Sequence, residues 1–196
     1  MSSAFIAAFR GNGSAYRVAT CRWRGFTLVE LMVTIAIAAI LTMIAVPSFQ
    51  RLILSNRLTT SANALVDAVN AARLEAIKLN ATTQFCGSST TNTGDTLGAA
   101  CTQSGAVYAL PQSATTAGQV RAPPPGVTPP VQSGTINAIR FSGQGFGYAP
   151  AAGPNNLYSG NIAVVCTSQL ASGNQRIVSM TAGSILAVAS STGTCP

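Results

Sequence analysis

The chain has 196 residues, with 11 Lys and Arg, 4 Asp and Glu and no His. The absence of histidine excludes a histidine base, a Ser–His–Asp triad, a Cys–His pair and an imidazole metal site. Four acids leave few candidates for paired-carboxylate chemistry. A hydrophobic fraction of 47% excludes a highly charged disordered protein. We therefore expect one modest domain that is not an enzyme and has no cofactor.

The first 25 residues form a basic leader. It contains no acid and four of the eleven basic residues, which are Arg10, Arg17, Arg22 and Arg24. A predominantly apolar run of 21 residues follows, from Phe26 to Val46. At ~1.5 Å per residue a helix of this length spans ~30 Å, the thickness of a bilayer core. Because the basic residues precede this run, the positive-inside rule places the leader in the cytoplasm.

Two simpler interpretations of this segment are a cleavable secretory signal and a plain membrane anchor. A secretory signal has an apolar core of ~7–15 residues and a small-residue cleavage site after it. Here the run is longer, and Pro47-Ser-Phe49 lacks an Ala-x-Ala pattern. A plain anchor leaves Glu30 unexplained, since a carboxylate inside a span costs roughly 2.5–3.5 kcal/mol and usually has a partner.

The junction Arg24-Gly-Phe-Thr-Leu-Val-Glu-Leu31 resembles the cleavage and methylation site of type IV prepilins. The resemblance implies that a prepilin peptidase cuts after Gly25 in the cytoplasm and that the new N-terminal Phe26 is N-methylated. It identifies Glu30 as the signature acid of the family and Pro47 as the position of a helix kink. Loss of the leader leaves seven basic and four acidic side chains, a charge of only +3.

Glu30 is the residue for which we expect an assembly role. In a filament its carboxylate can pair with the Phe26 ammonium of a neighbouring subunit, which neutralises a charge among apolar helices and fixes the register. The simpler alternative is an acid that snorkels to the membrane edge.

Residues 47–80 are expected to continue the helix in amphipathic form. Apolar residues recur at spacings of three and four, with Val66 and Ile77 widening the stripe and Asn80 as a stop. The stripe consists of Leu58, Ala62, Leu65, Val69, Ala72 and Ala76. We predict one long helix over about 26–80, membranous over 26–46 and amphipathic over 47–80.

Residues 81–196 are rich in Thr, Ser, Gly and Val and predict short strands. The last two strands are joined by a hairpin link at Ala182-Gly183, and Gly143–Gly147 predicts a turn or bulge. The six expected strands are Thr82–Cys86, Ala106–Leu110, Ile136–Phe141, Ile162–Thr167, Arg176–Thr181 and Ser184–Ala189. The sheet needs a second layer, and the helical stripe provides one. The expected fold is α+β and pilin-like: a long N-terminal helix on antiparallel β-sheets, with 47–196 as one globular module.

The Pro-rich segment from Arg121 to Pro130 cannot be a central strand. We expect an exposed loop, partly in polyproline II conformation. It is either a variable surface loop or a ligand for a partner, and the first interpretation is the simpler one.

Five cysteines are present, and Cys21 leaves with the leader. Cys86, Cys101, Cys166 and Cys195 remain in a domain expected to face the oxidising periplasm, which predicts disulfides. Chain order favours Cys86–Cys101 and Cys166–Cys195 among three possible pairings. The alternative of a Cys₄ zinc site lacks the usual CxxC spacing.

Three C-terminal stretches resemble the GspH/FimT group of minor pseudopilins and minor pilins: Ile139–Gly145, Ile162–Cys166 and Gly173–Ser179. The resemblance implies a single-pass protein of the bacterial inner membrane that joins other pilin or pseudopilin subunits near a filament tip. The machine is a type II secretion system or a type IV pilus. Some pilus members bind DNA through a Gly-Arg-x-Arg-like segment, where this chain has Gly173-Asn-Gln-Arg176. Arg176 is therefore either a DNA contact or a solvated charge at a strand end. A stand-alone membrane-anchored binding module, with no leader processing, is the third hypothesis.

Overall fold

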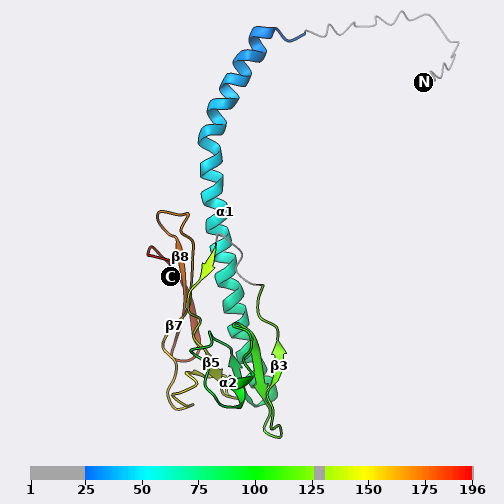
Figure 1. Ribbon diagram of the computed structural model, residues 1–196, viewed down its shortest axis with the longest axis vertical. Coiled ribbons are helices and arrows are strands. Elements are labelled where there is room, and N and C mark those ends of the chain that lie inside the picture. The colour runs from blue at the N-terminus through cyan, green and yellow to red at the C-terminus, as the bar shows by residue number, and fades with distance from the viewer. Residues whose placement is uncertain (1–24, 126–130, 196) are drawn as a thin grey trace, which may run out of the picture. The chain divides into compact units, whose positions relative to one another are not determined.

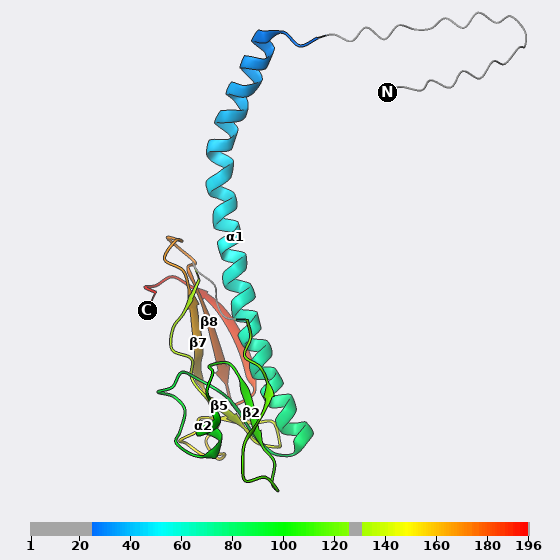
Figure 2. The ribbon, with the colours of Figure 1, turned by 45° about the vertical axis from the view of Figure 1, so that its right-hand side comes forward.

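The structure of the chain is a computed structural model that describes residues 25–125 and 131–195. Helix α1 (Leu28–Leu79) is followed by short strands (Figure 1). The chain divides into two compact units between Met43 and Ile44. The second unit contains the rest of α1 and all the strands, and in Figures 1 and 2 this part of α1 lies beside both sheets. The α+β architecture predicted from the sequence, a long helix on antiparallel sheets, is confirmed.

Helix α1 agrees with the predicted helix to within two residues at each end. Its C-terminus is closed by Asn80, the predicted stop, which adopts a left-handed conformation with φ 43°. The amide of Ala81 donates to the Ala76 carbonyl (3.1 Å) and that of Asn80 to the Ile77 carbonyl (3.2 Å). These two bonds form a Schellman motif, which satisfies carbonyls that the helix end would leave open.

The second half of α1 supplies one side of the core. All six residues of the predicted stripe are buried, and they pack against strand residues that include Phe85, Phe141 and Met180. Val66 is partly buried, but Ile77 is 47% exposed, so the stripe is narrower than predicted at its end. Ile77 is exposed because it lies in the last turn of α1, where its side chain is beside the loop at Gly145.

The first sheet has five antiparallel strands in the order β3-β2-β1-β5-β6. They are β1 (Thr82–Phe85), β2 (Val107–Leu110), β3 (Gly118–Arg121), β5 (Ile139–Phe141) and β6 (Gly147–Tyr148). The second sheet has four antiparallel strands in the order β4-β7-β8-β9. They are β4 (Gln132–Ser133), β7 (Gly160–Cys166), β8 (Gln175–Thr181) and β9 (Ile185–Ser191).

All six predicted strands exist, and four small elements were missed: β3, β4, β6 and helix α2 (Thr96–Ala100). The missed strands are either fully exposed or two residues long, so they have no apolar alternation. The predicted strand 136–141 begins only at Ile139. Asn137 donates its amide to the Ile162 carbonyl of β7 (2.8 Å), because the chain crosses here from the second sheet to the first.

The Pro-rich segment follows β3, which is an edge strand that ends at Arg121. Residues 122–125 are in no strand, as predicted, but Pro123 and Pro124 are half-buried beside Gly105 and are not fully exposed. Residues 126–130 of the predicted loop lie outside the described residues.

The two sheets meet at backbone atoms of Gly147, Tyr158 and Gly183. Gly147 donates to Gly183 (2.7 Å), Gly183 to Tyr158 (2.8 Å), and Tyr158 to Gly147 (2.8 Å). The predicted Ala182-Gly183 hairpin link is confirmed, with φ of 51° and 65° at the two residues. A Cβ at Gly183 would lie 2.5 Å from the Gly147 carbonyl oxygen. This contact therefore requires glycine for both its conformation and its lack of a side chain.

We expect Gly183→Ala to lower the free energy of unfolding by about 2–4 kcal/mol, since it adds a clash to the left-handed strain of about 1–2 kcal/mol. Gly153→Ala is the matched control, because Gly153 also has a positive φ (75°) but has open space around it. Urea denaturation of the full chain in maltoside micelles measures both. An equal loss of unfolding free energy in the two variants would show that the close approach of the sheets at Gly183 contributes nothing to stability.

Candidate functional site

The N-terminal segment begins α1 with a cap. The Glu30 amide donates to Thr27 Oγ1 (3.2 Å) and the Leu31 amide to the Thr27 carbonyl (3.1 Å). Thr27 is thus the N-cap, and Thr27-Leu-Val-Glu30 has the spacing of a capping box. The sequence contains this signal, but the prediction considered Glu30 as a filament contact or a snorkelling acid and not as part of a cap.

Glu30 lies in the first turn of α1, where a negative charge is favourable to the helix dipole. The described residues contain two ion pairs, Glu75–Lys78 and Asp95–Arg140, and Glu30 takes part in neither. Its side chain is exposed. A carboxylate in this position is available to a cation from another molecule.

The apolar segment from Phe26 to Val46, in which Glu30 lies, presents its side chains outward within its own unit. The exposed fractions include 78% for Phe26, 64% for Met32 and 61% for Leu41. By length and composition α1 can cross a membrane, and the described residues hold one such helix. A surface this apolar must be covered by lipid or by other helices.

Pro47 lies inside α1 and is exposed. Proline has no N–H, so it leaves the carbonyl of Met43 without its helical partner. The two compact units divide directly after Met43. The kink itself remains a prediction.

The predicted cysteines form two disulfides, Cys86–Cys101 and Cys166–Cys195, with Cα–Cα distances of 5.5 and 5.7 Å. These are the pairs that chain order favours, and they leave none of the four thiolates for a zinc ion. The second disulfide attaches the C-terminal tail to β7. Asn174 reinforces it, since its side-chain amide donates to the Gly193 carbonyl (2.8 Å).

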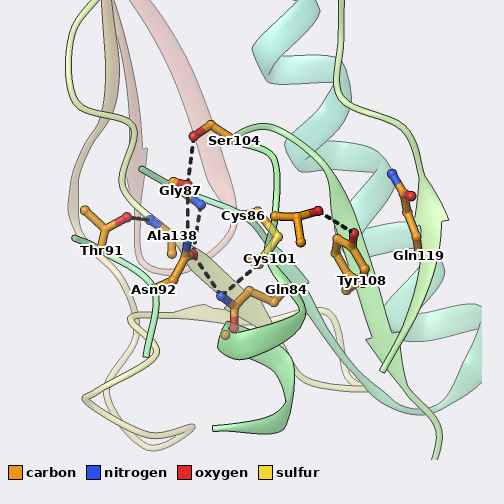
Figure 3. Close-up of a disulfide and its surroundings, with 12 residues drawn as sticks. Gln84, Cys86, Gly87, Thr91, Asn92, Cys101, Ser104, Tyr108, Gln119 and Ala138 are labelled. Carbon is orange, nitrogen blue, oxygen red and sulfur yellow. Dashed lines mark hydrogen bonds between the residues drawn. A yellow bond between two sulfur atoms is a disulfide. The ribbon is translucent and has the colours of Figure 1, made fainter. Parts of the chain in front are cut away.

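A polar network surrounds the first disulfide (Figure 3). Gln84 is fully buried, and its amide donates to Asn92 Oδ1 (3.1 Å) and to the Cys101 sulfur (3.4 Å). Asn92 in turn donates to the Gly87 carbonyl (3.2 Å). These hydrogen bonds hold the segment that connects β1 to α2 against one face of the first sheet.

Arg140 extends this network from β5. It is only 8% exposed; its Nε donates to Gln84 Oε1 (2.8 Å), and its Nη2 donates to Thr93 Oγ1 (2.9 Å) and pairs with the Asp95 carboxylate. Asp95 also caps α2 through the Gly98 amide (3.1 Å). The pKa of Asp95 lies well below its usual value, mainly because its carboxylate accepts the hydrogen bond from Arg140. Burial acts in the opposite direction and raises this pKa. Sequence reasoning missed this pair, because nothing in the spacing of Asp95 and Arg140 links them.

Arg176, the predicted DNA contact, joins β8 to α1. Its Nη2 donates to Ser55 Oγ (3.0 Å) and its Nε to Thr59 Oγ1 (3.3 Å) on the helix. Its Nη1 lies within hydrogen-bond distance of Ser190 Oγ on β9 (3.0 Å). The remaining partners are the backbone carbonyls of Gly173 and Gln175. The guanidinium therefore has five protein partners, while the residue stays partly exposed.

We expect Arg176→Ala to lower the free energy of unfolding by about 1–3 kcal/mol, since it removes charge-assisted bonds between the helix and the second sheet. Arg121→Ala is the control, because Arg121 is exposed and its side chain has no recorded partner among the described residues. Urea denaturation compares the two. Equal stability of both variants would contradict the structural role of Arg176.

Comparison with known proteins found two family matches. A family model described as type II transport protein GspH matches residues 61–184, more than half of the chain, and the prokaryotic N-terminal methylation motif matches residues 24–46. The curated proteins and the solved structures that were compared contain no match. The first match covers the last part of α1, from Ser61 onward, and strands β1 to β8, and the second covers the junction and the apolar segment. The chain therefore belongs to the GspH family and carries the N-terminal methylation motif of type IV pilin-like prepilins.

Proposed function

We propose that the chain is a minor pseudopilin or minor pilin that enters a filament after its leader is removed. The peptidase cuts between Gly25 and Phe26, and Phe26 is then N-methylated. The methylation motif over residues 24–46 supports this, and α1 begins only two residues after the cut.

The mature chain is anchored in the inner membrane by residues 26–46, with 47–196 as a periplasmic module. The observation that carries this proposal is the run of exposed apolar side chains from Phe26 onward, interrupted by one acid, Glu30. Lipid covers such a surface before assembly, and the helices of neighbouring subunits cover it afterwards. The two disulfides also suit an oxidising compartment.

The subunit acts at or near the filament tip, where it helps to begin or cap a type II secretion pseudopilus or a type IV pilus. This finer placement rests on the resemblance to minor members of the family. The partners are the prepilin peptidase and the other pilin or pseudopilin subunits.

The alternative, a DNA-binding minor pilin, has less support. DNA binding needs several basic groups that converge on phosphates. Arg140 is buried and paired, and Arg176 is held by five hydrogen-bond contacts. A gel shift with the full chain in maltoside micelles tests the alternative. We expect no salt-dependent shift.

Immunolabelling of sheared filaments tests the proposed function. Antibodies against the periplasmic module are expected to label filament ends in cells that hold the complete machine. Labels along the whole filament would contradict the tip placement, and absence from filaments would contradict the assembly role. A deletion strain then separates the two machines: loss of an exported protein indicates type II secretion, and loss of pili indicates a type IV pilus.

A further inference from the structure

Three of the six described arginines are held by protein groups. Arg140 and Arg176 have the partners given above, and Arg73 donates to the Ser184 carbonyl (3.1 Å). Arg51, Arg57 and Arg121 have no recorded side-chain hydrogen bond or ion pair with another described residue. Two of these three, Arg51 and Arg57, lie together on α1.

Arg51 and Arg57 line one groove of about 470 Å³. Pro47, the nearly buried Leu54 and Gln169 of the β7–β8 connection also line it. No acid is among its described lining residues. Two guanidinium groups, the amides of Gln50 and Gln169 and an apolar surface suit a phosphate that carries an apolar attachment.

The groove also follows the apolar segment closely in the sequence, since its lining residues on α1 run from Pro47 to Arg57. The apolar segment ends at Val46, and Arg51 follows about 7 Å further along the helix at 1.5 Å per residue. The headgroup layer is about 5–7 Å thick on each side of the hydrocarbon core. Arg57 is about 16 Å beyond Val46, but a helical side chain leans toward the preceding turn, which here is toward the membrane.

We propose that this groove binds the phosphate of an anionic phospholipid in the periplasmic leaflet of the inner membrane. This inference rests on the membrane anchoring in the proposed function. Once the leader is removed, Arg51 and Arg57 are the basic residues nearest to the apolar segment. A lipid bound here holds the module against the bilayer surface, and it must be released when the subunit is extracted into a filament.

Solution NMR of the full chain in maltoside micelles tests the site. The probes are short-chain phosphatidylglycerol, short-chain phosphatidylcholine and inorganic phosphate. We expect phosphatidylglycerol to cause saturable shifts at the Gln169 amide and the Nε–H groups of Arg51 and Arg57. Phosphatidylcholine is expected to cause none, and inorganic phosphate to need at least tenfold higher concentration.

Variants then assign the binding to the two arginines. A basic residue near an anionic lipid surface contributes about 1 kcal/mol, or about fivefold in affinity, so R51Q/R57Q is expected to weaken phosphatidylglycerol binding at Gln169 about 30-fold. K78Q/R121Q removes the same charge away from the groove and is expected to leave the affinity unchanged. Equal loss in both double variants, no shift in the wild type, or equal affinity for inorganic phosphate would each overturn the proposal.

Alkaline extraction of cell membranes distinguishes failure of this inference from failure of the proposed function. A chain that stays in the membrane pellet but shows no lipid-induced shift contradicts the lipid site alone. A chain released into the supernatant contradicts the anchoring itself.

Discussion

Replacing Arg140 with methionine is expected to lower the free energy of unfolding by about 2–4 kcal/mol. Methionine fills a similar volume, so the loss comes from the polar groups that remain. Gln84 is fully buried and loses the donor to its Oε1, and Asp95 loses its ion-pair partner. A buried acceptor without a donor costs about 1–3 kcal/mol, and loss of the partially solvated ion pair adds to this.

Urea denaturation of the full chain in maltoside micelles measures this loss, with Arg121→Met as the control on an exposed edge strand. Combining Arg140→Met with Asp95→Ala isolates the coupling between the two side chains. A loss below about 1 kcal/mol for Arg140→Met would contradict the structural role of the network.

The same pair gives stability a dependence on pH. The pKa of Asp95 is lowered in the folded state, mainly by the hydrogen bond from Arg140, whereas in the unfolded chain it is about 3.9. The stabilisation is therefore complete above about pH 4 and is lost as the pH falls below that value. Solvent screening limits its size, because the Asp95 side chain is 51% exposed. In Arg140→Met, the decline of stability below pH 4 should be shallower than in the wild type.

Replacing Glu30 with alanine is expected to remove the subunit from filaments while leaving leader cleavage intact. Without Glu30, an ammonium at Phe26 enters the apolar interior of a filament with no partner. Breaking a buried ion pair by removing one partner costs about 3–5 kcal/mol, which corresponds to a loss of incorporation of roughly 150-fold to 4,000-fold. Western blots of sheared filaments, compared with the membrane fraction, measure the incorporated share.

Asp67→Asn is the matched control, because Asp67 is also an exposed acid on α1 that takes part in no recorded ion pair among the described residues. Glu30→Gln separates charge from capping, since it keeps a capping-box side chain at the third helical position but cannot pair with an ammonium. If Glu30→Gln assembles like the wild type, capping rather than charge pairing is the role of Glu30.

Features that repeat along the chain could be predicted from sequence. The stripe from Leu58 to Ala76 recurs over five turns, so it predicted both the helix and its buried face. Asn80 and Ala182-Gly183 were recognisable because few residues tolerate the left-handed conformations that those positions require.

Contacts between polar residues far apart in the chain could not be predicted. Asp95 and Arg140 are 45 residues apart, and no periodic pattern connects them. Arg176 was identified as notable for its charge, but its partners Ser55 and Thr59 lie more than 110 residues earlier. This chain has few charged residues, so each one that becomes buried on folding leaves fewer charged side chains available to bind a partner.

In the proposed function, the mature N-terminus of this prepilin is created at the junction of leader and helix. Mass spectrometry of the chain isolated from the membranes of cells with a prepilin peptidase tests this directly. We predict an N-terminal peptide that begins with N-methylated Phe26. An intact Met1, or a cut at any position other than Gly25–Phe26, would contradict the account.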